Sequence, residues 1–308
     1  MLGRTLRAAL AGACAATLLL APATAAVADD CPPPPSCSVP GGAPHCDPTP
    51  YTAAVIESQP SWYWRLGEDR ERALDWLTGV GTSLALGRQV ERSVPGAIAC
   101  DENAAVSLSG ATPDGVWESH LVGDPDGVVV PAPGTQSFAL AIWVKPRTLD
   151  GSSRRIGGHE QQEGGWFVAA RSDRLTFSRY QRLPLGTAWS TVTVPRGLPL
   201  GRWSFVVAAY GPDRVMRLYV DGAEVGRLAS DLQLPPLPPP ALPDEPYPDR
   251  GRLVLGASGR TWSAGDRSSR MYLEWDGALD EAAVYRRTAT PTAAHVRRLW
   301  EVGTTGGR

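Results

Sequence analysis

Apolar side chains recur at every second position in several short segments of this chain. In residues 137–146 the even positions from Phe138 to Val144 are large and apolar, and Ala139, Ala141 and Trp143 occupy the odd positions. An extended strand places these two sets on opposite faces. A strand that is apolar on both faces is typical of the space between two packed layers. The pattern therefore predicts a central strand of a layered β structure.

A second segment, residues 203–210, is also apolar on both faces and precedes the pair Asp221-Gly222. A type I′ turn needs positive φ at both central residues, and Asp-Gly tolerates that conformation. The sequence therefore predicts a hairpin, with Tyr219 opposite Glu224 on one face and Leu218 opposite Val225 on the other.

Short apolar runs separated by Gly, Pro, Asp and Asn continue along the chain from Tyr51, and about 250 residues of this kind favour one all-β domain. The segments that we expect to form strands are 62–66, 83–86, 104–108, 127–130, 138–145, 166–171, 174–180, 190–194, 203–210, 215–220, 224–228, 252–256 and 272–285.

One helix is predicted near the C-terminus. Thr290 suits its cap, Pro291 its first position, and Gly303 its end. The proline-rich segment 234–248 favours polyproline II and cannot join a central sheet, so we interpret it as a stiff surface insertion.

The first 28 residues have the pattern of a secretory signal peptide. Arg4 and Arg7 precede the apolar residues 8–20, and small residues up to Ala28 suit cleavage. Residues 29–50 are rich in Pro, Cys, Gly and Ser without periodicity, which is typical of a linker. We therefore expect an extracellular protein with a signal peptide at 1–28, a linker at 29–50 and a β domain at 51–308.

Four cysteines follow the predicted cleavage site: Cys31, Cys37, Cys46 and Cys100. An even number in an exported chain predicts two disulfides, with three alternative pairings. Cys31–Cys37 with Cys46–Cys100, and Cys31–Cys46 with Cys37–Cys100, are the two that we favour. The sequence alone does not decide between them.

Loss of the signal peptide would remove Arg4 and Arg7 and no acid, which changes the formal charge from −2 to −4. Such mild acidity gives no electrostatic reason to expect nucleic acid as a partner, nor an anionic membrane. We expect no membrane insertion, because no segment after the signal peptide is apolar over a spanning length.

A series of motifs follows in a fixed order along the chain. It comprises Trp62-Tyr-Trp-Arg-Leu-Gly-Glu68, Asp126-Gly-Val-Val-Val-Pro131, residues 138–146, Leu200-Gly-Arg-Trp-Ser204, Leu218-Tyr-Val-Asp-Gly222 and Trp275-Asp-Gly-Ala-Leu-Asp-Glu-Ala-Ala-Val-Tyr285. This series resembles laminin-G-like domains of the concanavalin A-like superfamily from about Tyr51 to Gly303. The resemblance implies an all-β jelly-roll sandwich of two antiparallel sheets with a short C-terminal helix. It also implies that Asp280 is a structural carboxylate bonded to backbone amides.

Many relatives of this kind hold calcium near the segment that follows Gly110. Asp124 and Asp126, with Asp114 or Glu118, could supply oxygen ligands for such an ion. However, Ser109 stands where the family tends to have an aspartate. The alternative without a metal is an exposed turn that Asp and Gly stabilise. Calcium is thus a candidate ligand, and no other cofactor is expected.

Some jelly-roll enzymes carry two glutamates on one strand, with carboxyls about 5 Å apart in retaining glycosidases. Glu274-Trp275-Asp276 begins that pattern, but Leu279 occupies the position of the second acid and Asp280 comes one residue late. The four histidines belong to no His-Glu-x-x-His motif. We therefore expect no catalytic residues.

The tryptophans divide into two groups. Those within strand patterns are expected in the core: Trp64, Trp143, Trp166 and Trp203. Those in or beside predicted loops could present a flat ring to a ligand: Trp117, Trp189 and Trp262. Sugars stack on such rings, and Arg260, Asp266 and Arg267 near Trp262 suit their hydroxyls. The alternative is that these rings cover the ends of the sandwich.

Two functions remain. The favoured one is a secreted, monomeric, non-catalytic module that binds carbohydrate or an extracellular protein through its rim loops, with Trp117, Trp262, Arg260, Asp266 and Arg267 as ligand contacts. The alternative is a glycoside hydrolase or polysaccharide lyase on the same scaffold.

Overall fold

The computed structural model describes residues 48–69, 71–77, 79–87, 89–110, 121–123, 137–160, 164–232, 253–258, 273–287 and 290–306. Within these ranges the elements of the first half are α1 (Pro50–Glu57), β1 (Trp62–Trp64), β2 (Arg72–Asp75), β3 (Gly79–Leu86), β4 (Val90–Pro95), β5 (Ala104–Ser109), β6 (Leu121–Gly123) and β7 (Ser137–Pro146). Those of the second half are β8 (Arg154–Glu160), β9 (Gly164–Ala170), β10 (Leu175–Leu183), β11 (Gly186–Val194), β12 (Ser204–Tyr210), β13 (Val215–Val220), β14 (Ala223–Ala229), β15 (Val254–Leu255), β16 (Asp276–Arg287) and α2 (Ala293–Thr305).

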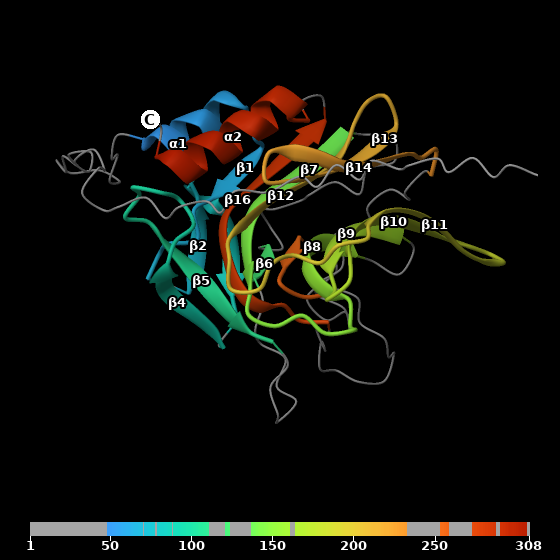
Figure 1. The fold of residues 1–308 in the computed structure, drawn as a ribbon, viewed down its shortest axis with the longest axis horizontal. Coiled ribbons are helices and arrows are strands. Elements are labelled where there is room, and N and C mark those ends of the chain that lie inside the picture. The colour runs from blue at the N-terminus through green and yellow to red at the C-terminus, as the bar shows by residue number, and fades with distance from the viewer. Residues whose placement is uncertain are drawn as a thin grey trace, which may run out of the picture.

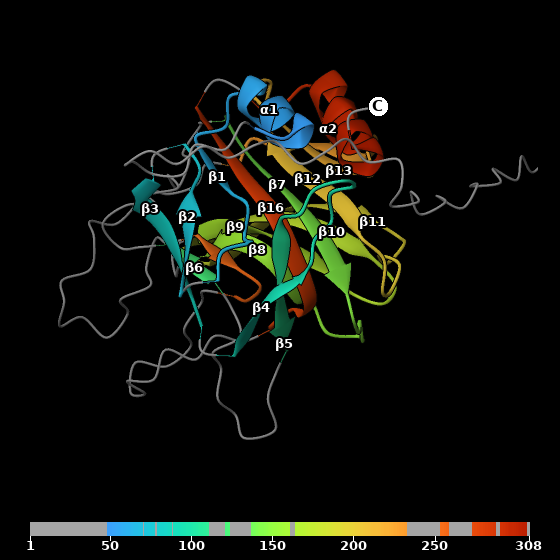
Figure 2. The ribbon, with the colours of Figure 1, turned by 90° about the vertical axis from the view of Figure 1, so that its left-hand side faces the viewer.

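The strands pair antiparallel and form two stacked sheets (Figure 1). One sheet has the order β1-β16-β7-β12-β13-β14, and the other has the order β6-β15-β8-β9-β10-β11. Strands β2 and β3 connect the two, and β5 with β4 extends the first sheet beside β16. Both helices lie over the outer face of the first sheet, as the view in Figure 2 also shows. The fold is a jelly-roll sandwich, which confirms the predicted fold class.

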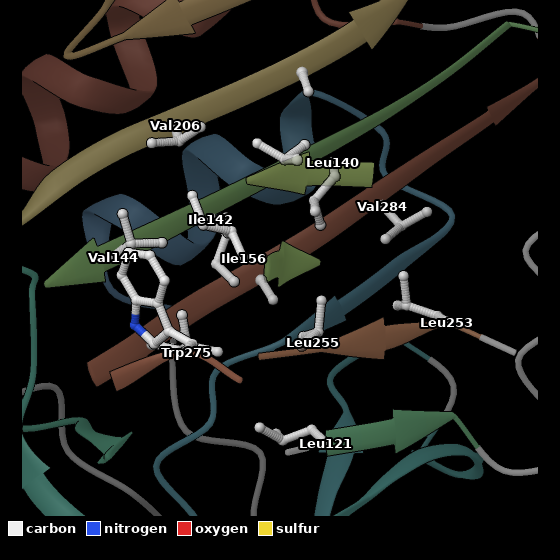
Figure 3. Close-up of a cluster of buried hydrophobic side chains, with 14 of the residues drawn as sticks. Leu121, Leu140, Ile142, Val144, Ile156, Val206, Leu253, Leu255, Trp275 and Val284 are labelled. Carbon is white, nitrogen blue, oxygen red and sulfur yellow. The ribbon is translucent and has the colours of Figure 1, made fainter. Parts of the chain in front are cut away.

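The main core lies between the two sheets. Leu140, Ile142 and Val144 of β7 point into it, with Ile156 of β8 and Leu255 of β15 facing them from the second sheet (Figure 3). A strand between two layers must be apolar on both faces. The prediction for residues 138–145 is therefore confirmed, because the intervening odd residues pack on the helix side.

A second core lies between the first sheet and the helices. Its members are Tyr51, Ala54, Val55, Tyr63, Ile98, Ala139, Ala141, Trp143, Phe205, Val207, Ala209, Tyr219, Ala283, Tyr285, Val296 and Leu299. The sequence analysis did not predict α1, which Thr49 caps by accepting a hydrogen bond from the Thr52 amide. Its Tyr51 hydroxyl lies 2.8 Å from the Trp143 indole nitrogen, which donates to it.

The predicted limits of the C-terminal helix were wrong at both ends. Thr292 rather than Thr290 caps α2, and its hydroxyl accepts from the His295 amide. The helix runs past Gly303 and ends at Gly306, which is left-handed with φ +68°. Gly303 instead lies within α2, at a point where the helix packs closely on the sheet, since a Cβ there would lie 2.5 Å from the Trp143 ring. A glycine on the buried face of the helix was therefore mistaken for the residue that ends it.

The Asp221-Gly222 turn forms as predicted, with φ of +50° and +79°. Tyr219 lies opposite Glu224, but Leu218 pairs with Gly226 rather than with Val225. A bulge between Leu218 and Tyr219 shifts the register by one residue. That part of the predicted pairing was wrong.

Strand β8 was not predicted, because Gly157 and Gly158 interrupt its apolar pattern. Both glycines are required by close approach: a Cβ on Gly157 would lie 2.8 Å from Leu255, and one on Gly158 would lie 2.5 Å from the Trp166 carbonyl oxygen. Glycine inside a strand can thus mark tight packing instead of a turn. The predicted strand at 127–130 and the proline-rich segment 234–248 lie outside the described residues.

Candidate binding surface

Most residues that the sequence analysis selected for binding lie outside the described ranges. These are Trp117, Trp262, Arg260, Asp266 and Arg267 for the ligand, Asp114, Glu118, Asp124 and Asp126 for calcium, and the cysteines Cys31, Cys37 and Cys46. Their roles stay predictions. Cys100 is described and lies in a turn against the end of α2, close to Gly306. The pairing of the cysteines also stays a prediction.

Across the described ranges, no three or more His, Cys, Asp and Glu side chains group as a metal site would require. In the same part of the chain, neither helix has the length and apolar character needed to cross a bilayer.

The predicted core tryptophans are where expected. Trp64, Trp143 and Trp166 are buried, and Trp203 is partly buried against the core beneath the helices. Trp189 differs from them, because 51% of its surface is exposed. It lies in β11 rather than in a loop, which corrects its predicted position, and its ring is exposed as a ligand contact would require. That it contacts a ligand stays a prediction.

Trp189 belongs to an aromatic cluster on the outer face of the second sheet. On β9, Trp166 and Val168 point into the inter-sheet core, so Phe167 between them points outward. Tyr180 of β10 pairs directly with Trp189 across the β10–β11 hairpin. We call Phe167, Tyr180 and Trp189 the aromatic platform.

The rings of the platform fix one another in place. Tyr180 and Trp189 stack with centroids 4.9 Å apart and planes 29° apart, and Phe167 meets Trp189 edge-on at 6.2 Å. Such cross-strand aromatic pairs add roughly 0.5–1.5 kcal/mol beyond the area that they bury. Trp189 is therefore a held ring with a free face.

A buried ion pair supports the platform from β8. The Arg155 guanidinium lies over the Phe167 ring at 3.4 Å, and its Nε and Nη2 donate to the two carboxylate oxygens of Glu160 at 3.0 and 3.3 Å. Both side chains are more than nine-tenths buried. This two-point bond holds the guanidinium plane against Phe167.

Hydroxyl groups flank the exposed ring. Thr187 and Thr191 are two residues before and after Trp189, so they share its face, and both are exposed. The Thr191 hydroxyl lies 3.0 Å from that of Ser178 on β10. A flat aromatic face bordered by hydroxyls can stack on the C–H face of a sugar and exchange hydrogen bonds with its hydroxyls.

The acids of the catalytic hypothesis are engaged in the structure. Glu274 is fully buried, and Leu279 points into the inter-sheet core. Asp276 accepts from Arg147 at 2.7 Å and from the Thr148 hydroxyl at 2.5 Å. Asp280 accepts from the Ala97 amide at 2.7 Å, which confirms the structural role that the family resemblance implied.

A bulge in β16 brings two acids to one face. Leu279 and Ala282 both point into the inter-sheet core, although a regular strand would place them on opposite faces. The register with β7 shifts between Asp280 and Ala283, and Glu281 has φ +50°. As a result, the side chains of Asp280 and Glu281 both point to the side of the helices.

These acids belong to a buried polar cluster around Arg65. The Arg65 Nε donates to Glu281 at 3.1 Å, and its Nη2 donates to Asp101 at 2.5 Å. The Tyr63 hydroxyl also donates to Glu281, and the Asn103 amide donates to it at 3.2 Å. Two carboxyls, those of Glu281 and Asp101, therefore share one guanidinium, and the Asn103 amide also lies 3.5 Å from Asp280.

Burial raises the pKa of Glu281 to about 7, although Arg65 and Tyr63 oppose the shift. Burial and the neighbouring Glu281 also raise the pKa of Asp280 well above its usual range. The sequence marked Asp280 through its motif, but nothing in it signalled the bulge that adds Glu281 to the cluster.

The chain also matches a known family of sequences. A family model for laminin-G-like domains, described as the concanavalin A-like lectin/glucanases superfamily, matches residues 122–295, which is more than half of the chain. The chain belongs to this superfamily. The resemblance drawn from the motifs is thereby confirmed. No similar sequence was found among curated proteins.

Solved structures with the same fold include binding domains of bacterial toxins. The binding domain of botulinum neurotoxin serotype G is 12% identical with a TM-score of 0.53, and the match covers 79% of this chain and 51% of that one. The binding domain of Paraclostridial Mosquitocidal Protein 1 is 13% identical with a TM-score of 0.52, covering 77% and 51%. The binding domain of botulinum neurotoxin serotype D in complex with N-acetylneuraminic acid is 12% identical with a TM-score of 0.53, covering 80% and 52%. The chain thus spans about half the length of these domains, and at such identity the likeness shows the fold alone.

Proposed function

We propose that this protein is a secreted, non-catalytic module that binds extracellular carbohydrate on the aromatic platform. The observation that carries the proposal is Trp189, a ring stacked on Tyr180 with half of its surface open to solvent. A large exposed ring held rigidly in a sheet loses little entropy when a flat ligand stacks on it. Export after cleavage near Ala28, with disulfides at the four remaining cysteines, is part of the same proposal.

The fold supports a binding function. Its structural neighbours are binding domains, and one of them was solved with N-acetylneuraminic acid. The acids that an enzyme of this fold would need are bonded to Arg147, to Thr148 and to the Ala97 amide, or are fully buried. This favours binding over hydrolysis.

Affinity electrophoresis in gels containing soluble polysaccharides tests the proposal. We expect Trp189→Ala to weaken retention at least about tenfold, the size of effect that a central aromatic contact has in many interfaces. Trp76→Ala is the matched control, because Trp76 is also partly exposed, at 38%, but lies in the turn after β2. Equal retention of wild type and Trp189→Ala would remove the platform as the binding site.

The same samples test the non-catalytic part of the proposal. Incubation of each polysaccharide with the protein should release no new reducing ends. Turnover that persists in wild type and disappears in Glu274→Ala would establish the alternative, a glycosidase or lyase.

A further inference from the structure

Acidic residues are absent from the part of the chain that builds the exposed side of the platform. No Asp or Glu occurs between Asp173 and Asp213, whereas this stretch contains Arg174, Arg179, Arg182, Arg196 and Arg202. The whole chain carries a formal charge of −2. Charge is thus segregated along the chain, and the one charged side chain that the β10–β11 hairpin exposes is that of Arg182.

Arg182 is the cation of this stretch that lies beside the platform. It follows Tyr180 by two residues and therefore shares its face, and it pairs with Thr187, two residues before Trp189. Diagonal neighbours across a sheet have their Cα atoms about 7–8 Å apart, within reach of an arginine side chain. A sugar stacked on Trp189 is therefore within reach of the Arg182 guanidinium.

The other arginines near this face are engaged, either with a carboxylate or in the interior of the sandwich. Arg155 is bound to Glu160, and Arg171 and Arg174 are bound to Asp173. Arg179 points into the sandwich, where it lies over the Tyr210 ring. Arg182 is exposed, and among the residues that the structure describes it has no ion-pair partner. Within that part of the chain, no carboxylate competes for its guanidinium.

We infer that the platform selects a polysaccharide whose sugars carry an anionic group, with Arg182 as the residue that determines this preference. This inference rests on the proposed function. A guanidinium binds a carboxylate or a sulfate ester through two parallel hydrogen bonds. Trp189 would lie beneath the sugar, with the Thr187 and Thr191 hydroxyls on either side of it along β11. Arg182 reaches the same place from β10, so these contacts fit one charged sugar ring.

Retention of the purified protein is compared in gels containing polygalacturonate, dextran sulfate or neutral dextran. Polygalacturonate tests the carboxylate and dextran sulfate the sulfate ester. We expect the wild type to prefer one charged polymer over dextran, and rising NaCl to weaken that retention. Arg182→Gln should weaken retention on the charged polymer about fivefold, the upper range for an exposed ion pair.

Arg196→Gln is the matched control, because it removes the same charge from the same acid-free stretch. It lies seven residues beyond Trp189, past the end of β11. We expect it to retain the binding of the wild type. Equal effects of the two substitutions would mean that only overall charge matters, and would overturn the role of Arg182.

The remaining outcomes separate the two proposals. Retention that Trp189→Ala abolishes, but that Arg182→Gln leaves unchanged on charged and neutral polymers, would keep the binding function and overturn the anionic preference. Retention unaffected by Trp189→Ala would overturn both. Sedimentation with phosphatidylglycerol vesicles, lost in Arg182→Gln without any retention on polysaccharide, would replace the sugar by a lipid surface and also overturn the inference.

Discussion

The buried Glu281 makes the stability of this protein dependent on pH in an unusual direction. In most folded proteins the carboxylates are stabilised in their charged form, so protonating them in acid lowers the stability of the fold. Here Tyr63, Arg65, Asp101 and Asp280 surround Glu281 in a cluster with three carboxyls and one guanidinium. Burial raises the pKa of Glu281 more than Arg65 and Tyr63 lower it, and Asp101 adds to the rise, so we expect the folded state to favour a proton on Glu281. We expect Glu281→Gln, which mimics the protonated side chain, to remove this dependence.

The magnitude follows from the size of the shift. The pKa of Glu281 rises from 4.5 to about 7 on folding. One unit corresponds to about 1.4 kcal/mol, so the shift is worth about 3 kcal/mol. The folded state holds the proton more tightly than the unfolded chain. Its contribution is therefore fully present below pH 4.5 and is lost as the pH rises to about 7.

The assay is guanidinium unfolding at fixed pH values from 4.5 to 8, followed by tryptophan fluorescence. Subtracting the variant from the wild type removes the contributions of groups that do not interact with Glu281, while Asp280, whose pKa Glu281 raises, still adds to the difference. We expect this difference to change by about 3 kcal/mol across that range, with the wild type losing stability as the pH rises. Tyr63→Phe removes a hydrogen bond to Glu281 that lowers its pKa, so the loss should shift to higher pH. Parallel curves for wild type and Glu281→Gln would refute the reasoning.

Two further predictions concern packing and the rim. Gly303→Ala should destabilise the fold by about 1–3 kcal/mol in the same unfolding assay, because the added Cβ meets the Trp143 ring at 2.5 Å; an unchanged unfolding midpoint would contradict this packing. The rim loops that the sequence suggested are the competing site, so Trp117→Ala with Trp262→Ala should leave polysaccharide retention and thermal unfolding unchanged, and lost retention would place the ligand at the rim instead of the platform. Repeating the retention assay with EDTA tests the predicted calcium ligands.

Of the aromatic platform, only Trp189 could be selected from the sequence. Trp189 was a candidate from the sequence because it stands beside a predicted loop, where a flat ring can face a ligand. Its partners were not, since Phe167 and Tyr180 look like core residues in any strand pattern. Only the pairing of β9, β10 and β11 shows that they share the outer face with Trp189.

The buried acids of β16 also could be predicted only in part from the sequence. Asp280 belongs to a recognisable motif, and its bond to the Ala97 amide was expected in kind. In a regular strand Glu281 would point to the opposite face, into the inter-sheet core. The bulge that turns it toward Arg65 depends on the partners of β16, which lie up to 222 positions away along the chain, as Trp62 does from Val284.

Local sterics act over two to four residues, and the sequence records them directly. The alternation of apolar side chains determined that β7 is a strand with both faces buried. The pair Asp221-Gly222 determined a hairpin turn. The tertiary structure decided what lies against each face: helices over one sheet, Trp143 against Gly303, and a held but open ring at Trp189. These choices depend on contacts between segments far apart in the chain, and such contacts leave no period in the sequence.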